Sequence, residues 1–502
     1  MTSVFEETPY PPCPSDFNLA AHVLAAADRV PDKIALAVVK PTGAQRWSYA
    51  RLKQAILGSA TGLLNAGLKP GDRLLMRVGN SVEFPVAYLA AIAVGIVPIP
   101  TSSQLTLPEV QVLIDITTPA AILHDGVTAC PDGLRVIRTS ELSEWYGLAP
   151  AAFDFGDPNR LAYIIFTSGT SGKPRAVCHA HRAIWARGMM IEGWYGLIEA
   201  DRLMHAGAFN WTYTLGTGLM DPWTMGATAL IPAQGVDHAQ IPLLLKRHEA
   251  TIFAAAPGVY RNILKSGNLD LPKLRHGLSA GEKLPAATRD AWQSETGTRV
   301  YEAFGMSECS TFISSAPGSP ELVPESLGWP QPGRRIAIMG ETGPVPVGTP
   351  GVIAVHNSDP GLMLGYLDQP KDTAARFLED WFLTGDMGEM TENKDILYHG
   401  RADDMMNAGG YRVSPLEVEA AMMQHPDINE VGVTDIEIKA DTRIIAAYYV
   451  ADAAIDTDAL VQFAADRLAR YKQPRLFQRV ATLPRNANNK LVRRAMPDQP
   501  TL

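Results

Sequence analysis

The stretch TSGTSGKPR, residues 167–175, has the composition of a phosphate-binding loop. Glycines let a backbone approach a ligand closely, and successive backbone N–H groups can surround phosphate oxygens. The stretch is not a Walker loop, because only two residues separate Gly169 from Gly172 and a proline follows Lys173. We therefore predict that it holds phosphates for a different chemistry.

The composition limits the class of protein. The chain has 502 residues, about three times a typical domain length. Its net charge of −9 argues against a nucleic-acid partner, because such binders usually carry a basic face. The four cysteines, at positions 13, 130, 178 and 309, lack the spacing of a zinc site or a disulfide framework. This pattern indicates a reducing compartment.

No segment has the pattern of a membrane span or a signal peptide. The start, MTSVFEETPYPPCPSDFN, lacks the basic residues and apolar run of a signal peptide. The longest charge-free run, residues 84–104, is interrupted by Pro85, Gly95, Pro98 and Pro100. A span needs about 20 uninterrupted apolar residues. A buried helix followed by a buried strand explains the run better, and we predict a cytoplasmic protein.

The element patterns predict an α/β fold with largely parallel sheets. In the first half, helical patterns (residues 21–30, 49–67 and 82–95) alternate with short apolar strands (34–39, 73–78 and 120–125). The apolar strand 161–167 leads directly into the phosphate-binding loop. From about 325 to 400, dense Pro and Gly with short strands predict a small β-rich subdomain.

The last 100 residues have a mixed pattern of their own. A helix (414–425), two strands (430–438 and 442–450) and a helix (458–471) indicate a compact α+β domain. We expect an N-terminal domain over 1–401 and a C-terminal domain over 402–502.

Five stretches in a fixed order resemble one known family. They are TSGTSGKPR (167–175), YEAFGMSE (301–308), WFLTGD (381–386), GRADDMMNAGGYRVSP (400–415) and LPRNANNKLVRR (483–494). Together they resemble the adenylate-forming superfamily of acyl-CoA synthetases, peptide-synthetase adenylation domains and luciferases. The likeness covers nearly the whole chain. It is nearest to AMP-forming ligases of the benzoate, halobenzoate and medium-chain types. ATP, Mg²⁺ and coenzyme A are the implied cofactors.

The resemblance assigns the first loop to the β- and γ-phosphates of ATP. A carboxylate and a triphosphate repel one another, so the site must supply cations and N–H donors. The residues implied are Thr167, Ser168, Gly169, Thr170, Ser171, Gly172 and Lys173.

The second motif implies the nucleotide and the metal ion. Ser307, at a position where the family more often has Thr, would bond the α-phosphate, and Glu308 would bind Mg²⁺. Phe304 would lie against the adenine. The adjoining nucleotide-binding positions are Gly281, Glu282, Glu302 and Ala303.

The remaining motifs imply residues for the ribose, the hinge and catalysis. Asp386 would accept from the ribose hydroxyls, and Arg401 would meet the ribose or a phosphate. Asp403 matches the hinge about which the C-terminal domain turns. Lys490 matches the catalytic lysine that bridges the carboxylate and the α-phosphate. It follows Asn489, where glycine is commoner, and asparagine tolerates the left-handed backbone.

The family's second half-reaction uses the mobile C-terminal domain differently. Gly409 and Gly410 would line a narrow tunnel for the pantetheine arm, where a side chain would obstruct it. Tyr471, Gln473 and Arg475 match contacts to the CoA nucleotide. The CoA thiolate attacks the acyl-AMP, so no enzyme nucleophile is needed.

The acyl pocket should draw on His205, Trp211, Tyr213 and Gly305. Peptide-synthetase domains place an aspartate in this region, whereas this chain has Phe-Asn-Trp-Thr at 209–212. A neutral asparagine cannot offset a buried ammonium, which argues against amino acids. An aromatic or medium-chain acid fits better.

Other readings stay open. The enzyme could load a carrier protein instead of free CoA, although the YKQPR stretch and the two glycines favour CoA. A luciferase-like oxygenase or a non-catalytic nucleotide binder is also conceivable, and a homodimer is compatible with the family.

Overall fold

The computed structural model describes residues 1–168, 174–210, 212–265, 267, 269–323, 326–402, 404–408, 411–439, 442–468, 470, 472–485 and 491–500. Its contacts group the chain into two units. The larger unit comprises Phe5–Ile336 and Val355–Phe382. The smaller comprises Met1–Val4, Ala337–Ala354 and Leu383–Leu502. This grouping joins part of the β-rich segment to the C-terminal residues. The domain boundary that the sequence places at residue 401 stays a prediction.

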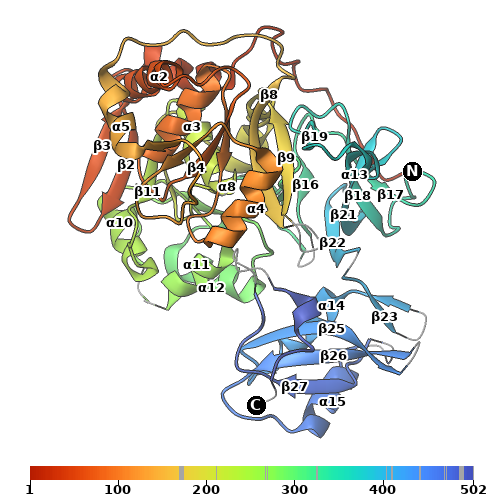
Figure 1. Ribbon diagram of the computed structural model, residues 1–502. Helices are drawn as coiled ribbons and strands as arrows, with labels where there is room; N and C mark the ends of the chain where they lie inside the picture. The colour runs from red at the N-terminus through yellow and green to blue at the C-terminus, as the bar shows by residue number, and fades with distance from the viewer. Residues whose placement is uncertain are drawn as a thin grey trace. The chain divides into compact units, whose positions relative to one another are not determined.

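A nine-stranded sheet forms the centre of the larger unit (Figure 1). Its six inner strands run parallel, and antiparallel strands flank them on both sides. In spatial order the strands are β16 (Trp329–Pro330), β15 (Ser310–Ser314), β14 (Val300–Met306), β13 (His276–Ala280), β12 (Ile252–Ala255), β10 (Arg202–His205), β11 (Thr228–Pro232), β2 (Ile34–Lys40) and β3 (Gly43–Ser48). The predicted α/β class with parallel sheets is confirmed.

Two smaller sheets complete the larger unit. A parallel one has the order β5 (Val97–Pro100), β4 (Arg73–Arg77), β6 (Ala121–His124) and β7 (Val136–Arg138). An antiparallel one has the order β19 (Gly365–Tyr366), β9 (Pro174–Ala180) and β8 (Leu161–Ser168).

Helices pack around these sheets. Helix α2 (Tyr49–Asn65) lies beside α3 (Glu83–Ala93), and both contribute to one large apolar core with α1 (Leu19–Leu24) (Figure 1). Further helices are α4 (Leu107–Thr117), α5 (Thr139–Glu144), α6 (Ala183–Ala186), α7 (Gly188–Met190), α8 (Thr212–Leu215), α9 (Asp221–Met225), α10 (Ile241–Arg247), α11 (Pro257–Leu264), α12 (Ala286–Thr296) and α13 (Pro370–Ala374).

The charge-free run 84–104 folds as predicted. Helix α3 is buried from Phe84 to Ala93, and the four residues of β5 are buried as well. An element buried on every face needs apolar residues all round, which explains the lack of a polar stripe. Within the described part of the chain, no helix is long and apolar enough to cross a membrane.

The β-rich segment forms a six-stranded sheet. Its path is β1 (Val4–Phe5), β17 (Ile336–Met339), β18 (Gly351–His356), β21 (Trp381–Met390) and β20 (Phe377–Leu378), with β22 (Ile396–Arg401) also paired to β21. Along β21 every second residue is buried, including Asp386. The two-residue period of a strand therefore fixes which face this carboxylate occupies.

The C-terminal residues form the predicted α+β structure. Strands β25 (Glu430–Lys439), β26 (Thr442–Val450) and β27 (Leu476–Arg479) form one sheet, and β23 (Met406–Ala408) pairs with β24 (Tyr411–Val413). Helices α14 (Pro415–Met422) and α15 (Thr457–Ala465) share a core with Ile445, Ala447 and Tyr449 of β26. The alternate residues Ala446 and Tyr448 face a second core.

Buried histidines make the stability of the larger unit depend on pH. Burial lowers the pKa of His179 and His276 to about 4, and of His181 and His205 to about 3. The folded protein keeps them neutral, whereas the unfolded chain takes up protons below about pH 6.5.

We therefore predict that the free energy of unfolding is highest above pH 6.5 and falls as the pH drops toward 4. Each of these histidines contributes up to about 1.4 kcal/mol per pH unit in that window. Urea unfolding at pH 7, 6 and 5 measures the effect. His238→Gln, at an exposed position, should leave the slope unchanged. A free energy of unfolding that stays constant from pH 7 to 5 would contradict the prediction.

Candidate active site

The structure positions the first motif between two antiparallel strands. Strand β8 ends at Ser168 and β9 begins at Pro174, and Thr167 pairs with Arg175 across the hairpin. The motif thus begins in one strand of a β-hairpin and ends in the other, whereas a Walker motif runs from a strand into a helix. Loop residues Gly169, Thr170, Ser171, Gly172 and Lys173 lie outside the described residues, so their roles stay predictions.

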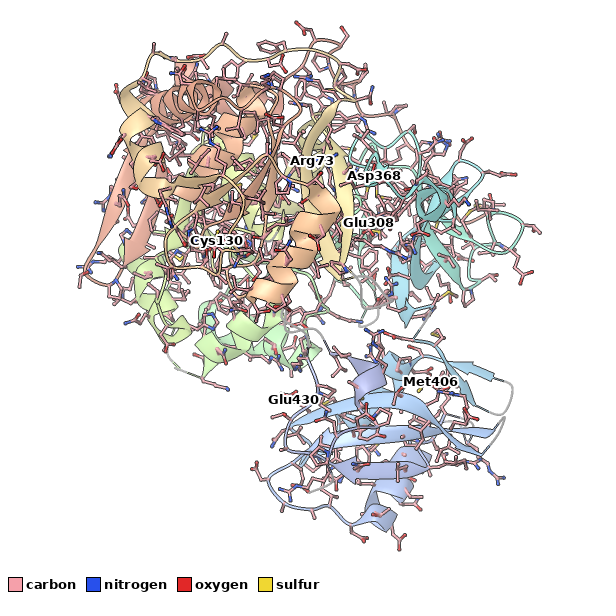
Figure 2. The ribbon with its side chains drawn as sticks, in the orientation of Figure 1. Arg73, Cys130, Glu308, Asp368, Met406 and Glu430 are labelled. Carbon is pink, nitrogen blue, oxygen red and sulfur yellow. The ribbon has the colours of Figure 1, made fainter. Side chains whose placement is uncertain are left out.

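Glu308 lies in the turn between β14 and β15 and is 7 % exposed. Its carboxylate accepts a hydrogen bond of 2.8 Å from the Tyr366 hydroxyl, and its carbonyl accepts one from Met363 N–H. Figure 2 labels Glu308. Burial, and next the nearby carboxylate, raise the pKa of Tyr366 to about 12. The tyrosine is therefore a neutral donor to an acidic group.

Arg175 connects the hairpin to this acid through the same tyrosine. Its guanidinium lies 5.2 Å from the centre of the Tyr366 ring. The last residue of the phosphate-loop motif and the predicted metal ligand therefore contact the same side chain. Sequence reasoning missed Tyr366, because 58 residues separate it from Glu308 and the GYLDQ context carries no spacing typical of a site.

Two further side chains hold the turn. His179 of β9 donates from Nε2 to the Ser307 carbonyl at 2.8 Å, and its ring stacks on Tyr163. Burial lowers its pKa to about 4, so the ring is neutral near pH 7 with its proton on Nε2. Arg187 donates to the Ser310 hydroxyl at 2.6 Å. Ser310 has φ of +63°, an unusual backbone for a side-chain-bearing residue, so the turn needs this support.

Arg187 is itself fixed by a buried acid. It forms a salt bridge with Asp221 at 2.6 Å, and the two side chains are 9 % and 2 % exposed. The Tyr195 hydroxyl also donates to Asp221. Because the pair is buried and fully hydrogen-bonded, it is a rigid support for the Glu308 turn.

The candidate metal site has a donor set suited to magnesium. Glu308 receives one hydrogen bond from a neutral hydroxyl, so its carboxylate keeps lone pairs for a cation. Within the described residues, no group of three acidic, histidine or cysteine side chains could hold a metal unaided. Mg²⁺ commonly takes one or two carboxylates together with nucleotide phosphates, and Glu308 fits that use.

The predicted adenine segment is tied together by Glu302. The Glu302 carboxylate accepts from Leu284 N–H at 2.9 Å and from Arg289 at 3.1 Å. Burial raises its pKa despite these two donors. The turn after β13, where Gly281 has φ of +98° and Glu282 follows, is thereby joined to β14. Glu302 supports the segment in this way, and its contact with the nucleotide stays a prediction.

Strand β14 also carries Ala303, Phe304 and Gly305. The Phe304 ring packs edge-to-face on Phe312 at 5.4 Å. A Cβ at Gly305 would lie 2.1 Å from the Ser310 carbonyl oxygen. Only glycine therefore fits beside the turn at this point.

Asp386 and Arg401 pair across β21 and β22, and their contacts with the ribose stay predictions. Asp386 is 5 % exposed, accepts from the Tyr398 hydroxyl at 2.8 Å, and lies 3.4 Å from the Arg401 guanidinium. Burial and Asp386 raise the pKa of Tyr398 well above its usual value. Tyr398 is a second contact that sequence reasoning missed.

The C-terminal residues are only partly described. Gln473 donates to the Leu468 carbonyl at 2.8 Å, and Arg475 is exposed just before β27. Asp403, Gly409, Gly410, Tyr471 and Lys490 lie outside the described residues, so their roles stay predictions.

The chain on both sides of Lys490 is held by ion pairs. Arg485 and Leu491 form an isolated bridge, and Arg485 pairs with Glu430 at 2.9 Å. Arg493 pairs with Glu419 at 2.8 Å and with Asp404 at 3.4 Å. Glu419 is nearly buried, and burial raises its pKa in spite of Arg493.

His205 and Tyr213 meet at the end of β10, where the acyl pocket was expected. Their rings pack edge-to-face at 4.4 Å, and the Tyr213 hydroxyl donates to the Leu278 carbonyl at 3.1 Å. His205 is fully buried. Trp211, the third expected side chain, lies outside the described residues.

Comparison with known proteins identifies the family. Residues 23–367 match the family described as AMP-binding enzyme, and residues 417–490 match its C-terminal domain. The chain belongs to the AMP-binding enzyme family. Benzoate–CoA ligase of Thauera aromatica is 30 % identical over 85 % of this chain and 86 % of that protein.

Two other similar proteins cover even more of this AMP-binding enzyme. Acyl-coenzyme A synthetase ACSM3, mitochondrial, of Rattus norvegicus is 27 % identical over 89 % of this chain and 83 % of that protein. The crystal structure of ATP-bound MatB from Rhodopseudomonas palustris superposes with a TM-score of 0.87 at 27 % identity, covering 96 % of this chain and 98 % of that one. The predicted superfamily is confirmed.

The Tyr366–Glu308 hydrogen bond leads to a prediction about the magnesium dependence of this AMP-binding enzyme. Tyr366→Phe removes the donor and keeps the ring, so the carboxylate loses a partner that orients it. We expect the Mg²⁺ concentration for half-maximal ATP-dependent activity to rise about tenfold, since a hydrogen bond to a charged group contributes about 1.5–3 kcal/mol. A magnesium titration at fixed ATP measures it.

Tyr449→Phe is the control. Its hydroxyl accepts from Ile455 N–H in the C-terminal residues, so this variant should leave the magnesium titration unchanged. Wild-type magnesium dependence in Tyr366→Phe would show that the tyrosine does not orient the acid.

Proposed function

We propose that the protein is an AMP-forming acid–CoA ligase that activates an aromatic or medium-chain carboxylic acid. The observation that carries the proposal is the match of both the main and the C-terminal family models, in order along the chain. The buried Glu308, bonded to Tyr366 near the hairpin of the phosphate-loop motif, supports it. Its substrates are the acid, ATP and coenzyme A, with Mg²⁺ as the metal ion.

In the first half-reaction, the acid's carboxylate attacks the α-phosphorus of ATP, and pyrophosphate leaves. The hairpin loop binds the β- and γ-phosphates, and Asp386 accepts from the ribose hydroxyls. Lys490 offsets the charge that collects between carboxylate and α-phosphate. Glu308, oriented by the Tyr366 hydroxyl, would hold Mg²⁺, which when bound would offset the negative charge of the phosphates.

In the second half-reaction, the thiolate of CoA attacks the acyl carbonyl, and AMP leaves. The C-terminal residues exchange Lys490 for the segment with Gly409 and Gly410, which lets the pantetheine arm pass. Arg475, which is exposed, and Gln473 then meet the CoA nucleotide. A gated domain step of this kind separates the two reactions.

The acid class rests on the pocket and on the relatives. Relatives carry the names benzoate–CoA ligase, 3-hydroxybenzoate–CoA ligase and acyl-coenzyme A synthetase. The region of the expected acyl pocket contains aromatic side chains, and the ring of Tyr213 stacks on that of Trp194. No aspartate stands at 209–212 to pair with an amino acid's ammonium.

A cytoplasmic location and a possible homodimer complete the proposal. The four cysteines lack the sequence spacing of a disulfide framework, which supports a reducing compartment. Light scattering of the purified protein tests the dimer directly.

The decisive variant is Lys490→Ala. Removing the cation should lower acid-dependent pyrophosphate release by a factor of about 100 to 1000, the usual effect of deleting one group that stabilises transition-state charge. Thioester formation from preformed acyl-AMP and CoA should change little, because Lys490 has left the site by then. Both half-reactions are measured on the same preparation.

Lys273→Ala, at an exposed position, is the matched control and should retain both activities. Full pyrophosphate release by Lys490→Ala would refute the assigned role. Pyrophosphate release that CoA neither accelerates nor converts to thioester would point to a carrier protein as acceptor.

A further inference from the structure

One arginine links the turn around Glu308 to a helix of the expected acyl pocket. Arg187 donates from Nη1 to the Ser310 hydroxyl at 2.6 Å, and from Nε and Nη2 to the two carboxylate oxygens of Asp221 at 2.7 and 2.6 Å. Ser310 begins β15, the strand that follows Glu308, and Asp221 begins helix α9. A guanidinium is planar, so its fork of donors fixes the direction of each bond. Arg187 therefore holds one segment against the other.

The Asp221 end of this link is buried and rigid. Besides Arg187, the Asp221 carboxylate accepts from the Tyr195 hydroxyl at 2.7 Å. The Tyr195 hydroxyl also lies 2.9 Å from the Thr217 hydroxyl. A Cβ at Gly216 would lie 2.3 Å from Arg187 Cζ. Because Asp221 prevents the guanidinium from moving aside, glycine is required where the helix lies against it.

The same helix carries a side chain of the expected acyl pocket. Residues 212–225 are helical throughout, in the segments Thr212–Leu215, Gly216–Met220 and Asp221–Met225. The middle segment is π-helical, a rare form that is frequent at functional sites. Tyr213 lies in the first segment, and Asp221 opens the last. Arg187 therefore joins the part of the site where the acid is expected to the part where magnesium is expected.

The Ser310 end of the link lies at a strained position of the backbone. Ser310 has φ of +63°, a conformation that is costly for a residue with a side chain. Its hydroxyl also contacts the Met190 sulfur at 4.0 Å. The bond from Arg187 is charge-assisted and therefore stronger than this contact with sulfur. Losing it would leave Ser310 free to relax away from the left-handed backbone.

We propose that Arg187 is a positioning residue of the adenylation step, which fixes Ser310 so that Ser307 and Glu308 meet the phosphate and the magnesium ion. The proposal rests on the ligase function above. Met306 and Ser310 pair across the turn and enclose Ser307 and Glu308, so a displaced Ser310 displaces both. Misplacing a reacting group by about 1 Å can cost about 100-fold in rate.

Ser310→Ala cuts the link at one atom and leaves the Arg187–Asp221 pair intact. We expect the Mg²⁺ concentration for half-maximal acid-dependent ATP–pyrophosphate exchange to rise about tenfold, since a hydrogen bond from a charged group is lost. Thioester formation from preformed acyl-AMP and CoA should stay within about threefold, because that step does not use the magnesium triphosphate. Calorimetry should show weaker ATP binding with Mg²⁺ present and unchanged binding without it.

Two further variants separate positioning from backbone strain. Ser310→Gly removes the same hydroxyl but relieves the left-handed φ. Its free energy of unfolding should equal or exceed that of Ser310→Ala, while its magnesium dependence should remain as poor. Arg187→Lys keeps a charge opposite Asp221 without the planar fork, and we expect a similar tenfold rise. Adding Ser310→Ala to Arg187→Lys should change the magnesium dependence by less than about threefold more, because both remove the same bond.

Ser314→Ala is the matched control. The Ser314 hydroxyl is buried on the same strand, β15, but donates to the Gly193 carbonyl at 2.7 Å and makes no bond to Arg187 among the described residues. This variant should keep the wild-type magnesium dependence in exchange and in ATP binding.

The two proposals fail in different ways. If the wild type forms thioesters and Ser310→Ala keeps its magnesium dependence, the ligase function stands and the positioning role is overturned. Equal losses in both half-reactions, or a loss that Ser310→Gly reverses, also overturn the positioning role, because they indicate a purely structural one. If no acid gives a thioester but Ser310→Ala weakens ATP binding only with Mg²⁺, the positioning role stands and the ligase function fails. A wild type that binds no ATP with Mg²⁺ overturns both.

Discussion

The burial of Glu308 is the constraint on which the candidate site depends. A carboxylate that is 7 % exposed loses most of its hydration, at an effective cost of several kcal/mol when it has no partner. The Tyr366 hydroxyl compensates only part of that loss, because it is neutral. The Glu308 carboxylate can therefore bind a cation, and the fold must hold this carboxylate in place without neutralising its charge.

That requirement explains why the turn around Glu308 draws on distant elements. His179 reaches it from β9, Tyr366 from β19, and Arg187 from the helical segment after β9. Arg187 is held in turn by Asp221. A two-strand turn with a left-handed serine could not stay in place by local bonds alone. The surrounding contacts supply the rigidity that catalysis by fixed charges needs.

The smaller unit shows the same principle with different chemistry. Asp386 is buried by strand alternation, and Tyr398 and Arg401 supply one neutral and one charged partner. Near Lys490, Arg485 and Arg493 tie the chain to Glu430 and Glu419. Glu308, Asp386, Glu419 and Glu430 are thus each oriented by a tyrosine or an arginine.

The sequence predicted most of the secondary structure, because the pattern of apolar residues in each element reflects how that element is buried. The continuous apolar run of 444–450 predicts β26, and the charge-free run of 84–93 predicts the buried helix α3. The motif residues of β14 and β21 were found from the resemblance of short stretches to the motifs of one known family. Local patterns of this kind need no knowledge of the rest of the chain.

The sequence did not predict which side chains pair with one another. Neither the donation of Tyr366 to Glu308 nor that of Tyr398 to Asp386 has a sequence signature, and the engagement of Glu302 by Arg289 was not foreseen. That His205 and Thr214 have no hydrogen-bond partner among the residues the structure describes could not be foreseen either, since a buried histidine usually finds a protein partner. The sequence by itself determined the elements, the family and the reactive residue types. Only the tertiary structure decided which of those residues are neutral, paired or free to bind, because charge state and pairing depend on burial and on neighbours brought together from far along the chain.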